Sequence, residues 1–141
     1  GLTQLVNRLG YEHYLARLRV PATILMFDVD RFKDVNDCHG HLMGDACLRT
    51  IAGCIRRAYG NYGTCFRIGG DEFCVILTRR NAQYNTMTEI FQHLMDAARA
   101  ENPVLPMVSV GCSHFNPSTD ELADSLARAD ARMYQNKEAH R

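Results

Sequence analysis

A pair of glycines between two β-prone runs places the strongest constraint on how this chain can fold. Residues Thr64–Ile68 and Glu72–Leu77 are rich in apolar and β-branched side chains, and Gly69-Gly70 stands between them. This pattern predicts a β-hairpin, because glycine adopts the backbone angles of a tight turn without steric cost. At least part of the sheet must therefore be antiparallel.

The hydrophobic pattern predicts the remaining strands and helices. Ala22–Phe27 is a short apolar run that indicates a strand buried on both faces, and Met107–Cys112 indicates another strand. Apolar residues at i, i+3, i+4, i+7, i+8 and i+11 from Met87 to Ala98 indicate an amphipathic helix. Three further helical regions are expected. The first covers residues 2–18, with a candidate break at Gly10 and an end at Pro21, and the second begins at His41 and carries the apolar stripe Leu42, Leu48, Ile51, Ala52 and Ile55. The last helix begins at a capping box formed by Ser118 and Glu121, and one of its faces carries Leu122, Leu126, Ala129 and Met133. The order helix, strand, helix, hairpin, helix, strand, helix best fits an α/β sandwich.

Length and charge narrow the class of protein. A chain of 141 residues, 46% of them hydrophobic, suffices for one domain with its own core, so residues 1–141 are expected to form a single domain. Sixteen basic residues balance sixteen acidic ones, which argues against binding of nucleic acid and against membrane contact by this segment. No apolar stretch is long enough to span a bilayer, and no secretory leader opens the chain. A small, defined anionic ligand remains compatible with this balance.

The six cysteines indicate reduced thiols. They include no Cys-x-x-Cys pair, which excludes a zinc ribbon on spacing. Their even number leaves a disulfide framework as the alternative, but most of them lie inside apolar runs of a domain that needs no cross-links. Cys38, His39 and His41 lie close together in the sequence, yet a fourth metal ligand is missing from that loop.

Two sets of acidic residues fall where strands end. Asp28 and Asp30 follow the first buried strand, and Asp71 and Glu72 follow the glycines at the hairpin tip. Because side chains alternate along a strand, Asp71 and Glu72 point to opposite faces, and one of them can converge with Asp28 if the two strands are neighbours. Clustered carboxylates repel one another unless a cation lies between them, and hard oxygen ligands suit Mg²⁺ or Mn²⁺ with substrate phosphates. This arrangement favours phosphoryl chemistry; the alternative is an ordinary hairpin with a solvated acidic tip.

The segment from Arg31 to Asp45 lies between the two acidic sets in the sequence. A loop that enters a helix N-terminus offers free backbone N–H groups to a phosphate. Within this segment, Asn36 and Asp45 carry the amide and the carboxylate that suit the edge of a guanine base, with a capped helix start as the alternative. Lys137 and Arg141 lie four residues apart on the last helix, where they either end the helix in solvent or clamp a triphosphate.

A family signature runs through these same residues. Arg67-Ile68 followed by Gly69-Gly70-Asp71-Glu72-Phe73 resembles the signature of the GGDEF diguanylate cyclase domains. Leu2–Arg8 resembles the opening motif of the family without the Asp that usually begins it. The other segments that match, in order along the chain, are Phe27–Lys33, Asn36-Asp37, Gly40-His41, Gly44-Asp45, Val108–Gly111, Ala129-Asp130, Met133-Tyr134, Lys137 and Arg141. The resemblance extends over residues 2–141 and is specific as a whole.

The resemblance implies a fold and a reaction. The fold is α/β and palm-like, as in nucleotidyl cyclases, with a central, mostly antiparallel sheet of about five strands flanked by helices. The reaction is the condensation of two GTP molecules into cyclic di-GMP with release of pyrophosphate, assisted by Mg²⁺ or Mn²⁺. The residues that the resemblance implies at the metal are Asp28, Asp71, Glu72 and the backbone carbonyl of Val29, with Asp71 also the general base for the 3′-hydroxyl and Glu72 assisting. Those implied at GTP are Asn36 and Asp45 at guanine, His41 close to the nucleotide, the backbone N–H groups of Phe32 and Lys33, and Lys137 and Arg141 at the outer phosphates.

The resemblance also implies partners. Each such domain binds one GTP, so the reaction needs a transient homodimer of domains that face each other, and weak, concentration-dependent activity is expected of this chain. A regulatory sensor domain normally controls the pairing. Because the chain starts at Gly1 rather than Met, we expect a piece of a longer protein. The domain is expected in the cytoplasm, on a full-length protein that is free or membrane-anchored.

Some positions depart from the family pattern. Asn61 and Thr64 stand where many members carry an Arg-x-x-Asp site for product inhibition, so inhibition by low-micromolar cyclic di-GMP is not expected. His140 stands where a glycine often precedes the arginine. Three alternatives are a catalytically idle domain that senses GTP by binding it, a structural dimerisation module, and a nucleic-acid polymerase palm. The presence of all three acids, Asp28, Asp71 and Glu72, argues against an idle sensor. The number of ligand-like polar residues argues against a structural module, and the zero net charge argues against a polymerase palm.

Overall fold

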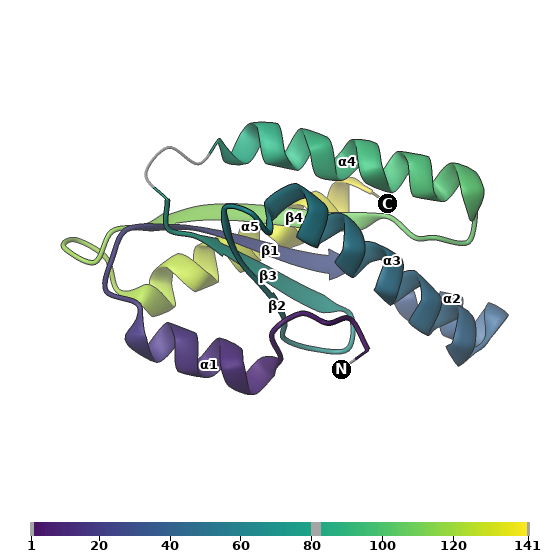
Figure 1. The fold of residues 1–141 in the computed structure, drawn as a ribbon, viewed down its shortest axis with the longest axis horizontal. Coiled ribbons are helices and arrows are strands. Elements are labelled where there is room, and N and C mark those ends of the chain that lie inside the picture. Colours follow the sequence, from purple (N-terminus) through teal and green to yellow (C-terminus); the bar gives the residue numbers. More distant parts are fainter. Residues whose placement is uncertain (1, 80–82, 141) are drawn as a thin grey trace.

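The predicted hairpin is present and lies in a sheet whose strands run in the order β2-β3-β1-β4 (Figure 1). The computed structural model describes residues 2–79 and 83–140. Each pair of neighbouring strands is antiparallel, and the sheet of the described residues has four strands rather than about five. The elements in chain order are α1 (Arg8–Arg17), β1 (Ala22–Val29), α2 (Phe32–His39), α3 (His41–Tyr59), β2 (Gly63–Arg67), β3 (Glu72–Leu77), α4 (Tyr84–Glu101), β4 (Val108–Phe115) and α5 (Leu122–Ala139).

The sheet separates two apolar cores, because the side chains of its strands alternate between its faces. On β1, Leu25 and Phe27 lie in the core with α3 and α4, whereas Ile24 and Met26 lie in the core with α1 and α5 (Figure 1). The first strand is therefore buried on both faces, as predicted. The helices contribute Leu48, Ile51, Ala52, Ile55, Met87, Phe91 and Met95 to the first core, and Tyr11, Ala129 and Met133 to the second.

The first helix is shorter than predicted. The segment before Asn7 is not helical, and Val6 forms a parallel β-bridge with Phe66. The helix α1 begins at Arg8, and the side chain of Asn7 accepts a hydrogen bond from the Gly10 N–H group (2.9 Å). Gly10 does not break the helix. A Cβ there would lie 2.4 Å from Val6 Cγ1, so glycine allows the preceding segment to pass close to the helix.

The segment predicted as a loop before the second helix contains a helix of its own, α2. Its one buried residue, Val35, packs into the core that contains α3 and α4. Gly40 is the single residue between α2 and α3, and its positive φ of 85° suits glycine. The apolar stripe predicted on α3 is wrong at Leu42, which is 86% exposed, and begins further along the helix.

The last helix begins without the predicted capping box. The residue before α5 is Glu121, and no side chain caps the helix. The N–H group of Ser118 donates to Asn116 Oδ1 (3.0 Å), so this serine belongs to the preceding turn. The apolar face predicted on α5 is confirmed, because Ala129 and Met133 are buried and the two leucines of that face pack beside them.

Small residues on β4 let α5 approach the sheet closely. Ser109, Gly111 and Ser113 are buried on β4, and Ser113 Oγ donates to the Ser125 carbonyl of α5 (2.6 Å). A Cβ at Gly111 would lie 2.1 Å from the Ala129 carbonyl oxygen. The backbone of α5 therefore rests directly on β4, and this contact fixes where the C-terminal end of α5 lies.

The six cysteines are free thiols, and four of them are buried. Burial raises the pKa of Cys65 and of Cys112 to about 11. Both thiols are therefore protonated at neutral pH and behave as small apolar side chains.

Candidate functional site

The fold brings the two acidic sets to one end of the sheet. The antiparallel register of β1 and β3 pairs Asp28 with Glu72. The Val29 N–H group donates to the Asp71 carbonyl (3.0 Å), which fixes the hairpin tip beside the end of β1. The two strands are neighbours, as the predicted convergence of their acids requires.

The negative charge at this end of the sheet is only partly balanced. Asp28 Oδ2 accepts a hydrogen bond from Lys137 Nζ (2.6 Å), whereas Asp28 Oδ1 is buried without a hydrogen-bond partner. Burial, and after it the charge of Asp28, raises the pKa of Asp71 above its usual value. The same two causes, in the same order, raise the pKa of Glu72. The charge of Asp28 therefore opposes the ionisation of both hairpin acids.

This set of oxygen donors fits a divalent cation. A buried carboxylate oxygen without a partner is unfavourable unless a cation or a donor meets it, and a cation would relieve the repulsion that raises the neighbouring pKa values. Within residues 2–79 and 83–140, no group of three His, Cys, Asp or Glu side chains has the arrangement of a metal site, and this includes Cys38, His39 and His41. Asp28, Asp71 and Glu72 together do not have that arrangement either. The pair Asp28 and Asp71 is nevertheless compatible with Mg²⁺ or Mn²⁺, because these ions need few carboxylates and complete their coordination with backbone, water or phosphate oxygens.

Two arginines hold the backbone of the hairpin tip, a role that the sequence pattern did not indicate. Arg67 donates from Nε to the Gly69 carbonyl (3.2 Å) and from Nη2 to the Gly70 carbonyl (2.8 Å). Arg8 donates from Nη1 to the Ile68 carbonyl (3.0 Å). Three consecutive carbonyls before the hairpin acids are thus fixed by guanidinium groups. The position of Arg67 close to the glycines could have suggested this role. Arg8 lies sixty residues from the carbonyl that it contacts, so no sequence pattern could have suggested its role.

The predicted guanine-binding residues lie where α2 meets α3. Asn36 of α2 lies against Gly44 of α3, because a Cβ at Gly44 would be 1.9 Å from Asn36 Oδ1. Asp45 follows Gly44 on α3 and is half-buried, and His41 at the start of α3 is exposed. The Asn36 amide therefore lies at the α2–α3 contact, and Asp45 is the neighbour in sequence of the α3 residue in that contact.

The first turn of α2 offers backbone donors. The first N–H groups of a helix have no acceptor within it, and the bonds to the Arg31 carbonyl begin with the Asp34 N–H group (3.0 Å). Arg31 itself has a left-handed backbone, with φ at 54°, and no side chain caps α2. The N–H groups of Phe32 and Lys33 can therefore meet an anion.

The two cations predicted at the phosphates are placed differently. Lys137 near the end of α5 reaches Asp28, as described above. Burial lowers its pKa, but the hydrogen bond and charge of Asp28, together with the charges of Asp30 and Asp71, outweigh burial, so its pKa is raised and the ammonium group stays charged. Arg141 lies outside the described residues.

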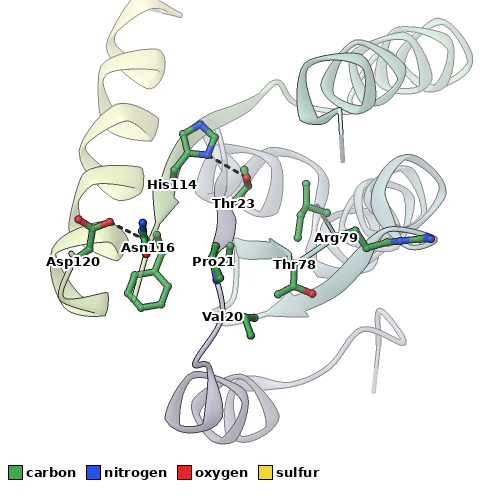
Figure 2. Close-up of a pocket in the computed structure, with 11 residues that line it drawn as sticks. Val20, Pro21, Thr23, Thr78, Arg79, His114, Asn116 and Asp120 are labelled. Atoms are coloured by element: carbon green, nitrogen blue, oxygen red, sulfur yellow. Dashed lines mark hydrogen bonds between the residues drawn. The ribbon is translucent and has the colours of Figure 1, made fainter. Parts of the chain in front are cut away.

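A separate hollow of about 600 Å³ lies at the opposite end of the sheet (Figure 2). It is lined by the start of β1 and the ends of β3 and β4, whereas the acids lie at the end of β1 and the start of β3. Two of its polar contacts are internal, between Thr23 Oγ1 and His114 Nδ1 (3.1 Å) and from the Asn116 N–H group to Asp120 Oδ2 (2.9 Å) (Figure 2). None of the predicted site residues within the described part of the chain lines this hollow.

Comparison with known proteins identifies the family of this chain and agrees with its fold. The family model described as "Diguanylate cyclase, GGDEF domain" matches residues 1–141. The chain therefore belongs to the GGDEF domain family. Among solved structures, the GGDEF domain of DgcB from Caulobacter crescentus in complex with c-di-GMP matches with a TM-score of 0.83 and 28% identity, over 100% of this chain and 90% of that one. The palm-like α/β architecture expected from the sequence is confirmed.

Two curated relatives show how much of a longer protein the chain spans. It is 36% identical to an uncharacterized 19.3 kDa protein in the repSA 5′ region of Streptomyces ambofaciens, over 96% of this chain and 76% of that protein. It is 34% identical to the diguanylate cyclase DgcZ of Escherichia coli, over 84% of this chain and 41% of that enzyme. The chain thus spans less than half the length of that enzyme.

Proposed function

We propose that this domain is a diguanylate cyclase that condenses two GTP molecules into cyclic di-GMP and releases pyrophosphate. One observation carries the proposal: neighbouring antiparallel strands bring Asp28 beside the hairpin acids, and Asp28 Oδ1 is buried without a partner. The named diguanylate cyclase to which the chain is similar supports the reaction class.

The acids would divide the chemical work. Asp28, Asp71 and the Val29 carbonyl would hold Mg²⁺ or Mn²⁺ with Glu72 close by, and the bound cation supplies charge that offsets the oxygens entering and leaving the phosphorus. Asp71 would accept the proton of the 3′-hydroxyl.

The binding residues would surround one GTP. Asn36 and Asp45 would read the guanine edge by hydrogen bonds, with His41 close to the nucleotide. The phosphates would be held by the N–H groups of Phe32 and Lys33 at the start of α2, and by Lys137 and Arg141 at the outer end.

The domain would act in pairs under external control. One site binds one GTP, so two copies of the domain would face each other in a transient homodimer, and a sensor domain of the full-length protein would regulate this pairing. Within the described residues, no helix is long and apolar enough to cross a bilayer. By analogy with its family, the reaction would take place in the cytoplasm.

Mass spectrometry of products from concentrated protein with GTP and Mg²⁺ tests the proposal. We expect cyclic di-GMP, and a rate per domain that rises with protein concentration because two domains must meet. A rate per domain that stays constant on dilution below any dimer dissociation constant would contradict the pairing. GTP binding without product at every concentration would indicate an idle GTP sensor, and absence of GTP binding would indicate an interaction module.

Replacing Gly44 with alanine is expected to weaken GTP binding about tenfold or more without unfolding the domain. The new Cβ would meet Asn36 Oδ1 at 1.9 Å, and this amide can only rotate away from its present position. Loss of one well-placed hydrogen bond to a base accounts for an effect of about this size. Titrations with GTP and with ATP measure the change in nucleotide affinity, and thermal melting tests whether the domain stays folded. Unchanged GTP affinity in Gly44→Ala would contradict the role proposed for Asn36.

A further inference from the structure

A second polar cluster lies next to the acidic site, and the proposed reaction does not use it. Ser109 Oγ donates to Asp30 Oδ1 (2.7 Å), and His140 Nδ1 contacts Asp30 Oδ2 and lies 3.2 Å from Ser109 Oγ. Asp30 is 8% exposed and Ser109 is fully buried. With Nδ1 protonated, the imidazole donates to the carboxylate, so every polar atom of this contact is satisfied.

The cluster joins three elements at the point where α5 ends. Asp30 follows β1 directly, Ser109 is the second residue of β4, and His140 is the C-cap of α5. The His140 N–H group donates to the Lys137 carbonyl (3.1 Å), so the residue that grips Asp30 also closes the turn that carries Lys137. One turn of helix therefore connects the Asp30 contact to the Asp28 contact.

The last turn of a helix frays unless something holds it. Here Asn136 Oδ1 accepts the Val110 N–H group (2.8 Å), which fixes one side of the turn to β4. The imidazole of His140 provides the anchor at the very end, against a buried carboxylate. Hydrogen bonds to charged groups are about twice as strong as neutral ones, so this anchor is a firm one.

We infer that His140 is a positioning residue, which clamps the end of α5 to Asp30 and Ser109 so that Lys137 is presented to the outer phosphates. This inference rests on the proposed function of the domain. His140 does not touch the nucleotide itself; it acts through Lys137. Its loss therefore weakens binding of a triphosphate and leaves binding of a monophosphate, which lacks the outer phosphates, unchanged.

Binding of two nucleotides to His140→Ala separates positioning from general damage. The probes are 3′-deoxy-GTP, which lacks the attacking hydroxyl and cannot be condensed, and GMP, both titrated by calorimetry with Mg²⁺. We expect His140→Ala to bind the triphosphate roughly 3- to 10-fold more weakly and GMP equally well. His140→Asn restores triphosphate binding in part, because its Nδ2 occupies the place of Nδ1 as a donor to Asp30.

A double-mutant cycle with Lys137→Met supplies the decisive comparison. If His140 acts through Lys137, then His140→Ala has a much smaller effect on triphosphate affinity in the Lys137→Met background than in the parent. Amide hydrogen exchange in the last turn of α5 is expected to accelerate in His140→Ala alone. Equal weakening of both nucleotides, or full additivity in the cycle, overturns the inference.

The inference and the proposed function fail in different ways. Parent protein that makes cyclic di-GMP while His140→Ala binds the triphosphate as the parent does would overturn the inference and leave the function intact. Parent protein that binds neither nucleotide would overturn both.

Discussion

Replacing Asp71 with asparagine is expected to abolish cyclic di-GMP formation without lowering the stability of the fold. The substitution keeps the shape of the side chain but removes the negative charge and the proton acceptor. A lost general base typically lowers the rate 10²- to 10⁴-fold, and weaker cation binding adds to this loss. The measurement is product formed per domain from GTP and Mg²⁺, at a concentration where the parent is active.

The stability of Asp71→Asn is expected to be preserved because of the direction in which the pKa of Asp71 is shifted. Burial and the charge of Asp28 raise the pKa of Asp71 in the folded protein above its ordinary value of 3.8. The folded state therefore holds this proton more tightly than the unfolded chain, and ionisation destabilises the fold once the pH exceeds the unfolded pKa. Asparagine is always neutral, so we expect Asp71→Asn to melt at the same or a higher temperature than the parent at pH 7. The difference shrinks as the pH falls toward 4.

A matched acid on the surface controls for the loss of charge as such. Asp96 on α4 has a side chain that is 74% exposed and pairs with Arg99 nearby on the same helix. Asp96→Asn is expected to leave both activity and melting temperature close to those of the parent, because such surface pairs contribute little. Product formation by Asp71→Asn at the parent's rate would remove Asp71 from the chemistry.

Replacing Gly111 with alanine is expected to destabilise the domain by about 3 kcal/mol or more. The added Cβ would lie 2.1 Å from both the Ala129 carbonyl oxygen and the Met133 nitrogen, and 2.7 Å from Met133 Cα. These are backbone atoms of α5, so no rotamer change relieves the clash, and the whole helix must move outward. Melting of the folded protein should fall by roughly 6–12 °C, since 1 kcal/mol shifts a domain of this size by about 2–4 °C.

Activity should fall together with stability in this variant. Outward movement of α5 carries Lys137 away from Asp28 and breaks the contact of His140 with Asp30. Gly53 on α3 provides the matched control, because a Cβ there meets nothing within 4 Å. Gly53→Ala is expected to stabilise the domain by about 0.5–1 kcal/mol, since alanine is the better helix former. Equal melting temperatures for Gly111→Ala and the parent would show that α5 does not rest on β4 as described.

Local patterns in the sequence determined much of the fold. The Gly69-Gly70 pair required a hairpin, and the apolar run at Ala22–Phe27 required a strand covered on both faces. The amphipathic spacing from Met87 to Ala98 required a helix, which α4 confirms. These features depend on backbone preferences and hydrophobic periodicity, which act between residues close in the chain. The meeting of the acids at the strand ends could be predicted only on the condition that the two strands were neighbours, because these acids are far apart in the chain.

Patterns that depend on a neighbour were misread. Val6 lies in the region 2–18 that was expected to be helical, but it pairs with Phe66 on β2. Leu42 fits the apolar stripe of the next helix by spacing, but it is exposed. Ser118 has the residue type and spacing of a capping box, but its N–H group is taken by Asn116. In each case a contact that spacing alone does not specify decided the outcome.

Tertiary structure alone decided how the site is held. Arg8 reaches a hairpin carbonyl sixty residues away, and α5 approaches β4 so closely that only glycine fits at Gly111. His140 meets Asp30 across 110 positions of sequence. Composition and periodicity carry no signal for such pairs, because the direction and reach of a side chain matter only after the elements have packed. The sequence thus determined which chemical groups this protein has and on which elements they lie, and the packing of α5 and α1 against the sheet decided which of them meet.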